Sequence, residues 1–184
     1  EFAAKSTKAD VSKGITLGPI NRTISENAVT YSTVEVALDR VARKATITLH
    51  GPDGHAPANM AEVEAQGDQS YMLRLARELD DAILHLRLNE MELGLVAFQT
   101  QGDPDLLLAH EAVLLVNKDH WLANETLEYW KRILKRIDVT SRSLVAIVEH
   151  GSCFAGVLAE LLWAVDRSYM MEDEFEGDNR PLAA

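Results

Sequence analysis

One apolar stretch that leads into a glycine-containing turn constrains this chain more than any other feature. Residues 144–148 are Leu-Val-Ala-Ile-Val, a β-prone run without alternating polar residues, so we expect a strand buried on both faces. Gly151 follows, and residues 156–165 are apolar apart from one acid, Glu160. This order predicts a strand, a tight turn and a helix, the unit from which layered α/β folds are built.

The rest of the chain extends this alternation and predicts an α/β fold with parallel strands. Two β-rich runs, 34–38 and 45–49, are joined by polar residues and predict a hairpin. Ser70 is placed to cap the clearest amphipathic helix, 71–87. Further helices are expected at 106–116, 120–137 and 156–165, and further strands at 94–100, 144–148 and 168–171.

The chain's 184 residues, 47% of them hydrophobic, fit a single domain with a substantial core. Residues 1–30 are polar and lack clear periodicity, so we expect a linker or an extension there, followed by a folded domain at 31–184. Such a beginning suggests that the chain was cut out of a longer one. Residues 172–179 predict an acidic loop.

Charge and composition exclude several classes of partner. Eighteen basic and twenty-nine acidic side chains give a net charge of −11, so we expect no binding to nucleic acid, which requires clustered Lys and Arg. No apolar run reaches the ~18–20 residues that span a bilayer, so we expect no membrane partner and a cytoplasmic location. Cys153 is the sole cysteine, which excludes an intramolecular disulfide. The six histidines lack zinc-helix spacing, so no metal is expected.

Four segments together resemble the crotonase (enoyl-CoA hydratase/isomerase) superfamily: 45–52, 79–83, 95–100 and, most specifically, 151–166. In that superfamily the last segment carries a Gly-rich turn, an acid on the helix and an Asp that closes the helix. Glu160 and Asp166 keep the family's separation. The resemblance implies a ββα spiral core, a CoA thioester as substrate without any further cofactor, and a homo-oligomer.

A narrower resemblance rests on residues 75–83, 117–122, 138–144 and 151–156 and covers about residues 14–171. These segments are similar to the second crotonase-like half of two-halved enzymes of aerobic benzoate degradation. The resemblance implies part of an enzyme that opens the ring of 2,3-epoxybenzoyl-CoA with water and releases formate. The other crotonase-like half of the same protein is then a partner. A strand that follows the acidic loop in the family is absent, which predicts a truncated module, incomplete at its C-terminus.

The same resemblance implies where a thioester would bind. In the superfamily, two backbone N–H groups hold the thioester oxygen as negative charge develops on it. One comes from the Gly-rich turn, of which Gly156 survives here, so Gly156 is the expected thioester-binding residue. The other comes from a Ser/Ala-Gly-Ala-Asp segment, and residues 101–105, Gln-Gly-Asp-Pro-Asp, do not match it. Pro104 has no N–H at all. The expected site is therefore at best half present.

Two acids are the candidate catalytic groups. Glu160 is flanked by leucines that could desolvate it, raise its pKa and suit it to acid/base catalysis, although a surface or ion-paired Glu is the alternative. Glu149 precedes the turn beside His150, at a strand end where α/β ligands collect. Neighbouring strand residues point to opposite faces, so Glu149 and His150 need not cooperate. Cys153 is a weaker candidate nucleophile because no His or Lys is tied to it by a motif.

Two alternatives to an active half remain open. The chain is compatible with a catalytically silent crotonase-like half, kept for packing and assembly, because the Ser/Ala-Gly-Ala-Asp segment is missing. It is also compatible with an enoyl-CoA hydratase-like enzyme that acts on another acyl-CoA.

If the turn binds a thioester, binding should depend on Gly156 more than on Glu160. Gly156→Val blocks the close approach of an oxygen to the backbone and should abolish acyl-CoA binding. Glu160→Gln keeps the shape of the turn and should impair only the chemistry. Calorimetric titration of both variants of the two-halved protein with benzoyl-CoA separates the outcomes. Wild-type affinity and turnover in a folded Gly156→Val variant make the turn structural.

Overall fold

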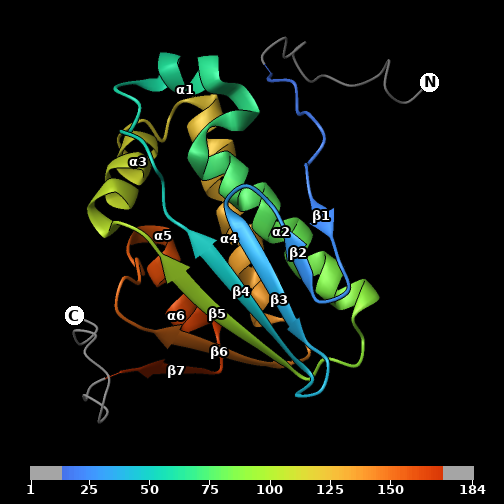
Figure 1. Ribbon diagram of the computed structural model, residues 1–184. Helices are drawn as coiled ribbons and strands as arrows, with labels where there is room; N and C mark the ends of the chain where they lie inside the picture. Colours follow the sequence, from blue (N-terminus) through green and yellow to red (C-terminus); the bar gives the residue numbers. More distant parts are fainter. Residues whose placement is uncertain (1–13, 172–184) are drawn as a thin grey trace.

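A computed structural model describes residues 14–171, in which seven strands form one sheet in the order β1 to β7 (Figure 1). The strands are β1 Thr23–Ile24, β2 Ala28–Thr30, β3 Val34–Asp39, β4 Lys44–His50, β5 Leu95–Gln101, β6 Ser143–Val148 and β7 Arg167–Met170. The helices are α1 Met60–Gln66, the short 3₁₀ helix η2 Gly67–Gln69, α2 Tyr71–Asn89, α3 Pro104–Val116, α4 Trp121–Asp138, α5 Gly156–Ala159 and α6 Leu161–Ala164.

The expected hairpin and parallel strands are both present. Strands β3 and β4 pair antiparallel, with Val34 opposite Leu49 at one end and Asp39 opposite Lys44 at the other. Strands β4, β5, β6 and β7 then pair in parallel, and each parallel step is bridged by helices, as parallel connections require. The α/β class is therefore confirmed.

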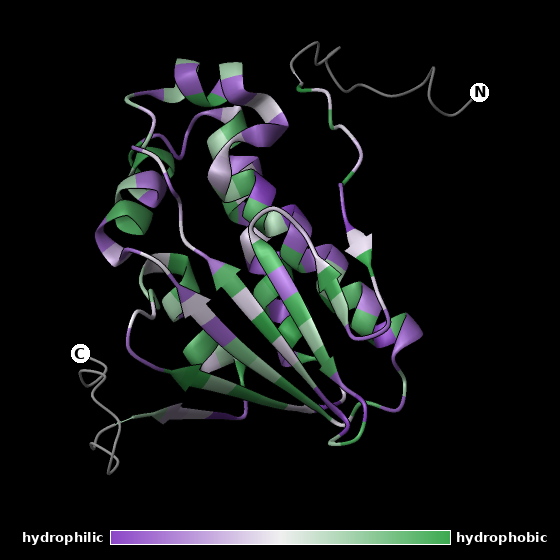
Figure 2. Ribbon diagram, viewed as in Figure 1, coloured by the Kyte–Doolittle hydropathy of each residue, from purple (hydrophilic) through white to green (hydrophobic). Residues whose placement is uncertain are grey.

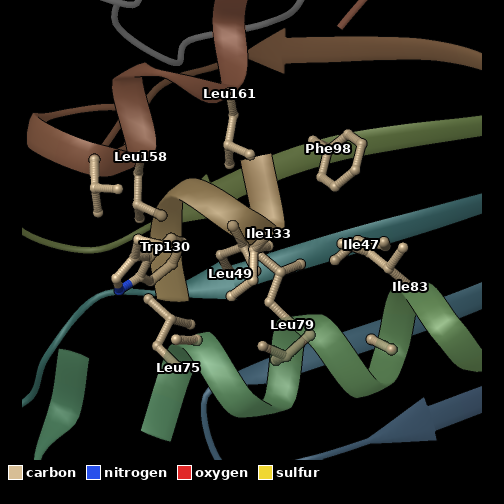
Figure 3. Packing of buried hydrophobic residues seen from close by; sticks show 14 of the residues in the cluster. Ile47, Leu49, Leu75, Leu79, Ile83, Phe98, Trp130, Ile133, Leu158 and Leu161 are labelled. Atoms are coloured by element: carbon tan, nitrogen blue, oxygen red, sulfur yellow. The ribbon is translucent and has the colours of Figure 1, made fainter. Parts of the chain in front are cut away.

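The long helices α2 and α4 lie across one face of the sheet (Figure 1). Both have mixed hydrophobic and hydrophilic sides in Figure 2, as expected for amphipathic helices. Beneath them Ile47, Phe98, Leu79, Trp130 and other side chains from the sheet and both helices form one buried cluster (Figure 3). The Trp130 indole N–H donates to the Met72 carbonyl at 3.0 Å, so the buried ring leaves no donor unpaired.

Strand β6 lies inside the sheet, between β5 and β7, but it is not buried on both faces. Leu144 and Ala146 are buried, whereas Val145, Ile147 and Val148 are half-buried. The expectation of two buried faces was wrong because α2 and α4 cover one face only, and β7 beside it is exposed along its length.

The helix expected at 156–165 is broken at Glu160 into α5 and α6. Leu158 and Leu161, on either side of the break, are fully buried. Helix α5 packs against α3 and α6 against α4. Trp163 on α6 is 83% exposed, so it does not fill the core as its size suggested.

The polar N-terminal segment contributes to the sheet. Within the expected linker or extension, residues 14–30 are described and contain β1 and β2, of which β2 pairs antiparallel with β3. Ser70 stands at the N-cap position of α2, but its side chain makes no capping hydrogen bond. The expected acidic loop at 172–179 lies outside the described residues. Across residues 14–171, no helix has the length and apolar character needed to cross a membrane.

A buried carboxylate fastens the start of β3 to α2. Glu78 is 5% exposed and accepts hydrogen bonds from Ser32 and Thr33. The Thr33 N–H and hydroxyl reach Glu78 Oε2 at 2.7 and 2.6 Å, and the Ser32 hydroxyl reaches Oε1 at 2.5 Å. A tight turn before the hairpin is thereby held against the helix layer.

Removal of this carboxylate should destabilise the fold. Glu78→Ala leaves the donors of Ser32 and Thr33 without their acceptor, and we expect a loss of about 1–3 kcal/mol in the free energy of unfolding. Glu78→Gln retains one acceptor oxygen and should lose less. Urea denaturation measures both, with Glu128→Ala as the control because its ion pair with Lys131 is solvent-exposed. Equal midpoints for Glu78→Ala and the control contradict the anchoring role.

Candidate active site

A hollow of about 810 Å³ lies between α3, α4 and α5. Its lining includes Gly156 of the turn and Glu160 of the helix, which the sequence identified as candidates. Glu111 and Val157 also line it. The remaining lining is mixed: Leu108, Leu115, Leu127, Trp130 and Leu134 are apolar, and Lys118, Asp119, Asn124, Glu128 and Lys131 are polar. Apolar walls with a few polar groups are typical of ligand pockets.

Gly156 has the left-handed φ of 48°, which favours glycine. A Cβ at this position would collide with Oε2 of Glu111. An oxygen does lie against the backbone at Gly156. That oxygen belongs to the protein's own carboxylate.

Glu111 reaches the turn from the buried face of α3. Its Oε2 accepts a hydrogen bond from the Val157 N–H at 3.2 Å. Burial raises the pKa of Glu111, the bond from Val157 opposes that shift, and the charge of Glu160 adds to it. A buried acid with a raised pKa in a concave site is a functional candidate.

The amides that follow β5 are largely engaged as well. The Gly102 N–H donates to the Gly151 carbonyl at 3.0 Å. Asp103 caps α3, its Oδ1 accepting from the N–H groups of Asp105 at 2.8 Å and Leu106 at 3.3 Å. Pro104 occupies the first turn of α3, where a missing N–H costs nothing.

Within residues 14–171, the backbone N–H groups of Asp103 and Gly156 donate no hydrogen bond. Each adjoins an amide that is engaged. The Gly156 N–H therefore has no acceptor within the described residues.

Glu160 lies between α5 and α6, faces the hollow and is exposed. The flanking leucines, Leu158 and Leu161, turn into the core and do not cover it. The expected desolvation of this acid is therefore absent. Glu160 lines the same hollow as Glu111, and its charge adds to the rise in the pKa of Glu111.

Glu149 belongs to a different concavity, of about 250 Å³ at the ends of β4, β5 and β6. Its Oε2 lies 3.4 Å from Nε2 of Gln99, and its backbone N–H donates to the Ser152 hydroxyl at 2.9 Å. Gln99 pairs with Thr48 across the sheet, and both are half-buried on the face opposite the core. His150 lines the same concavity, which does not include Gly156 or Glu160. The structure thus separates the two candidate catalytic acids.

Cys153 is fully buried beneath the turn, and its N–H donates to the Thr100 hydroxyl at 2.8 Å. Burial raises the pKa of its thiol, which disfavours the thiolate needed for nucleophilic attack. No cluster of three or more potential metal ligands occurs in the described part of the chain.

The sequence motifs did not identify Glu111, which follows His110 on α3. The available signal was its position on α3, four residues after Leu107 and three before Leu114, both buried. An acid on the buried face of a helix needs a partner or a function.

Comparison with known proteins now bears on this site. No family model matches the chain. The chain is 42% identical over 171 residues to a benzoyl-CoA-dihydrodiol lyase from Aromatoleum evansii, a match that covers 93% of this chain and spans 31% of the enzyme's length. This match confirms the resemblance to an enzyme of this kind, a benzoyl-CoA-dihydrodiol lyase. An enoyl-CoA hydratase from Geobacillus kaustophilus HTA426 superposes with a TM-score of 0.48 and 14% identity, over 77% of this chain and 46% of that one.

The contact between Gly156 and Glu111 predicts a stability coupling. Gly156→Ala should cost more than the ~1–2 kcal/mol of a left-handed alanine, because the added Cβ also displaces the carboxylate. Glu111→Ala in the same chain should remove that excess, giving a coupling of about 0.5–3 kcal/mol. Urea denaturation of the single and double variants measures it, with Gly54→Ala as the control, since nothing lies within 4 Å of its Cβ position. Strictly additive effects contradict the contact.

Proposed function

We propose that this chain is part of a CoA-thioester enzyme that opens the ring of 2,3-epoxybenzoyl-CoA with water and releases formate. The observation that carries the proposal is the 42% identity to a benzoyl-CoA-dihydrodiol lyase over 93% of the chain. Its proposed partners are the acyl-CoA substrate, the other crotonase-like half of the same protein and further copies of that protein. No cofactor is required, because a CoA thioester is the substrate.

The hollow supports this proposal by its chemistry. The Gly156 N–H is the donor proposed for the thioester oxygen, since it has no acceptor in the described residues. Leu108, Leu115 and Leu127 offer apolar contacts for an acyl group. Glu160, exposed to the hollow, is the group proposed to take a proton from the attacking water.

A catalytically silent half is the second candidate, and the engaged amides favour it. The Val157 N–H is taken by Glu111, and the Gly102 N–H by Gly151. An oxyanion hole needs donors that are free when negative charge develops. In this alternative the half stabilises the assembly, and the reaction takes place elsewhere in the protein.

Turnover assays distinguish the two candidates. In the natural protein that contains this sequence, Glu160→Gln should lower formate release from epoxidised benzoyl-CoA by about 10²–10⁴-fold if this half is active. The matched control is Glu128→Gln, which removes another carboxylate of the same hollow, one already paired with Lys131 at 2.5 Å. Unchanged turnover in Glu160→Gln assigns the silent role.

The 184-residue chain tested alone should show no measurable ring opening. The reason is that residues 101–105 do not match the superfamily's Ser/Ala-Gly-Ala-Asp segment and contain Pro104, which has no N–H. The loss of one oxyanion donor typically costs about 10²–10³ in rate. Formate detection with the isolated chain makes the measurement. Turnover comparable to that of a natural hydratase refutes this expectation.

A further inference from the structure

All the helices that connect the parallel strands lie on one face of the sheet. Strands β4, β5, β6 and β7 are neighbours in chain order and pair in parallel. Parallel crossovers are right-handed, so connections that always step in the same direction place their helices on the same face. The contacts agree, since α4 packs against α2, α3 and α6, and α3 packs against α5 (Figure 1). Within the described residues, the opposite face of these strands has no layer over it.

The side chains on this uncovered face suit contact with another layer. Alternation and register place there Thr46 and Thr48 of β4, Ala97 and Gln99 of β5, Val145 and Ile147 of β6, and Tyr169 of β7. We call these residues the open face. None of them is charged, and most are β-branched, small or aromatic, as is usual for a pleated surface that packs against other side chains.

The exposure of the open face is that of a partly covered surface. Ala97 is 1% exposed, whereas Tyr169 is 53% exposed. Val145 and Ile147 between them are half-buried. Parallel strands occur almost only in sheets that are covered on both faces, and apolar side chains gathered on a surface mark a contact site. The open face therefore fits a docking surface better than a surface designed for water.

A polar hollow of about 250 Å³ at the margin of the open face specifies the charge of its partner. The hollow includes Glu35 and Glu149, and neither carboxylate forms an ion pair within residues 14–171. Thr48, Gln99 and Ile147 of the open face also line it. A layer that covers these carboxylates must offset the cost of removing them from water. A Lys or Arg side chain on the partner does so.

We propose that the open face is the docking surface for the other crotonase-like half of the same protein. That half lays apolar side chains on the open face and brings a Lys or Arg to the hollow of Glu35 and Glu149. The inference rests on the proposed function, which supplies the other half as a partner. The chain spans 31% of the length of the benzoyl-CoA-dihydrodiol lyase that it matches, so a protein of that length has ample chain outside this sequence to cover the face.

A second copy of this chain is the competing occupant, and its charge argues against it. A two-fold contact sets the same surface of each copy against the other. Each copy carries a net charge of −11, and both would bring Glu35 and Glu149 to the contact. Such a contact adds like charges where a cation is needed.

Hydroxyl-radical footprinting tests the docking without any substitution. Tyr169 should be oxidised in the 184-residue chain and protected in the natural protein that contains this sequence. Met91, 78% exposed at the end of α2, is the control and should be oxidised in both. The same extent of oxidation of Tyr169 in both proteins overturns the docking.

Photo-crosslinking in the natural protein identifies the occupant. Benzoylphenylalanine in place of Thr48 should form crosslinks to residues of the same polypeptide that lie outside this sequence. The same substitution at Val41, 98% exposed beside the β3–β4 turn, is the control and should form none. Crosslinks between two polypeptides assign the face to a second copy, and crosslinks confined to this sequence leave it free. Either result overturns the proposal.

The predicted cation has its own test. Glu35→Gln should lower the urea midpoint of the natural protein and leave that of the 184-residue chain unchanged, because only the natural protein supplies the cation. An unchanged midpoint in both overturns the ionic contact. None of these measurements uses ring opening, so an undocked face leaves the proposed function standing, and an inactive protein leaves the footprint and the crosslinks to decide the docking.

Discussion

Burial of one sheet face beneath α2 and α4 is the constraint on which the rest of the molecule depends. Ile47 and Phe98 rise from the central strands to meet Leu79 and Trp130 (Figure 3). Because helical connections make β4, β5, β6 and β7 parallel, the carboxyl ends of these strands meet at one edge. Helices α3 and α5, which follow β5 and β6, then face each other there and enclose the hollow.

Local periodicity predicted the elements that keep the same side against the core along their whole length. Helices α2 and α4 and strands β3 and β4 belong to this group, because apolar spacing of 3.6 or 2 residues is written directly in the sequence. Strand β6 was predicted from an unbroken apolar run instead. Strands β1 and β2 were not predicted because they have only two and three residues; β1 pairs with β2, and β2 with β3. The break between α5 and α6 at Glu160 was not predicted either, since a uniformly apolar run does not show where a helix is interrupted.

The same distinction between local pattern and packing applies to the residues of the candidate site. Gly156 and Glu160 were identified by their order in a motif, and both line the hollow. Glu111 was not, because its contact with Val157 spans 46 residues and exists only after α3 and α5 have packed. Glu149 has the right chemistry, but strand alternation turns it to the other side of the sheet. A motif predicts which residues share a segment, and packing decides which ones share a site.

The turns that follow β4, β5 and β6 touch through their backbones. Gly102, at φ 150°, lies against Gly51 so closely that any side chain on it would strike the Gly51 backbone. Its N–H binds the Gly151 carbonyl at 3.0 Å. The turns at the ends of β4, β5 and β6 are thus held together by backbone contacts among Gly51, Gly102 and Gly151. Because close-packed backbone transmits displacement instead of absorbing it, a shift of the hairpin that ends at Gly51 is passed through Gly102 to Gly151. The turn that precedes α5 is therefore connected to the β3–β4 hairpin through backbone contacts, in addition to the pairing of β4, β5 and β6 in the sheet.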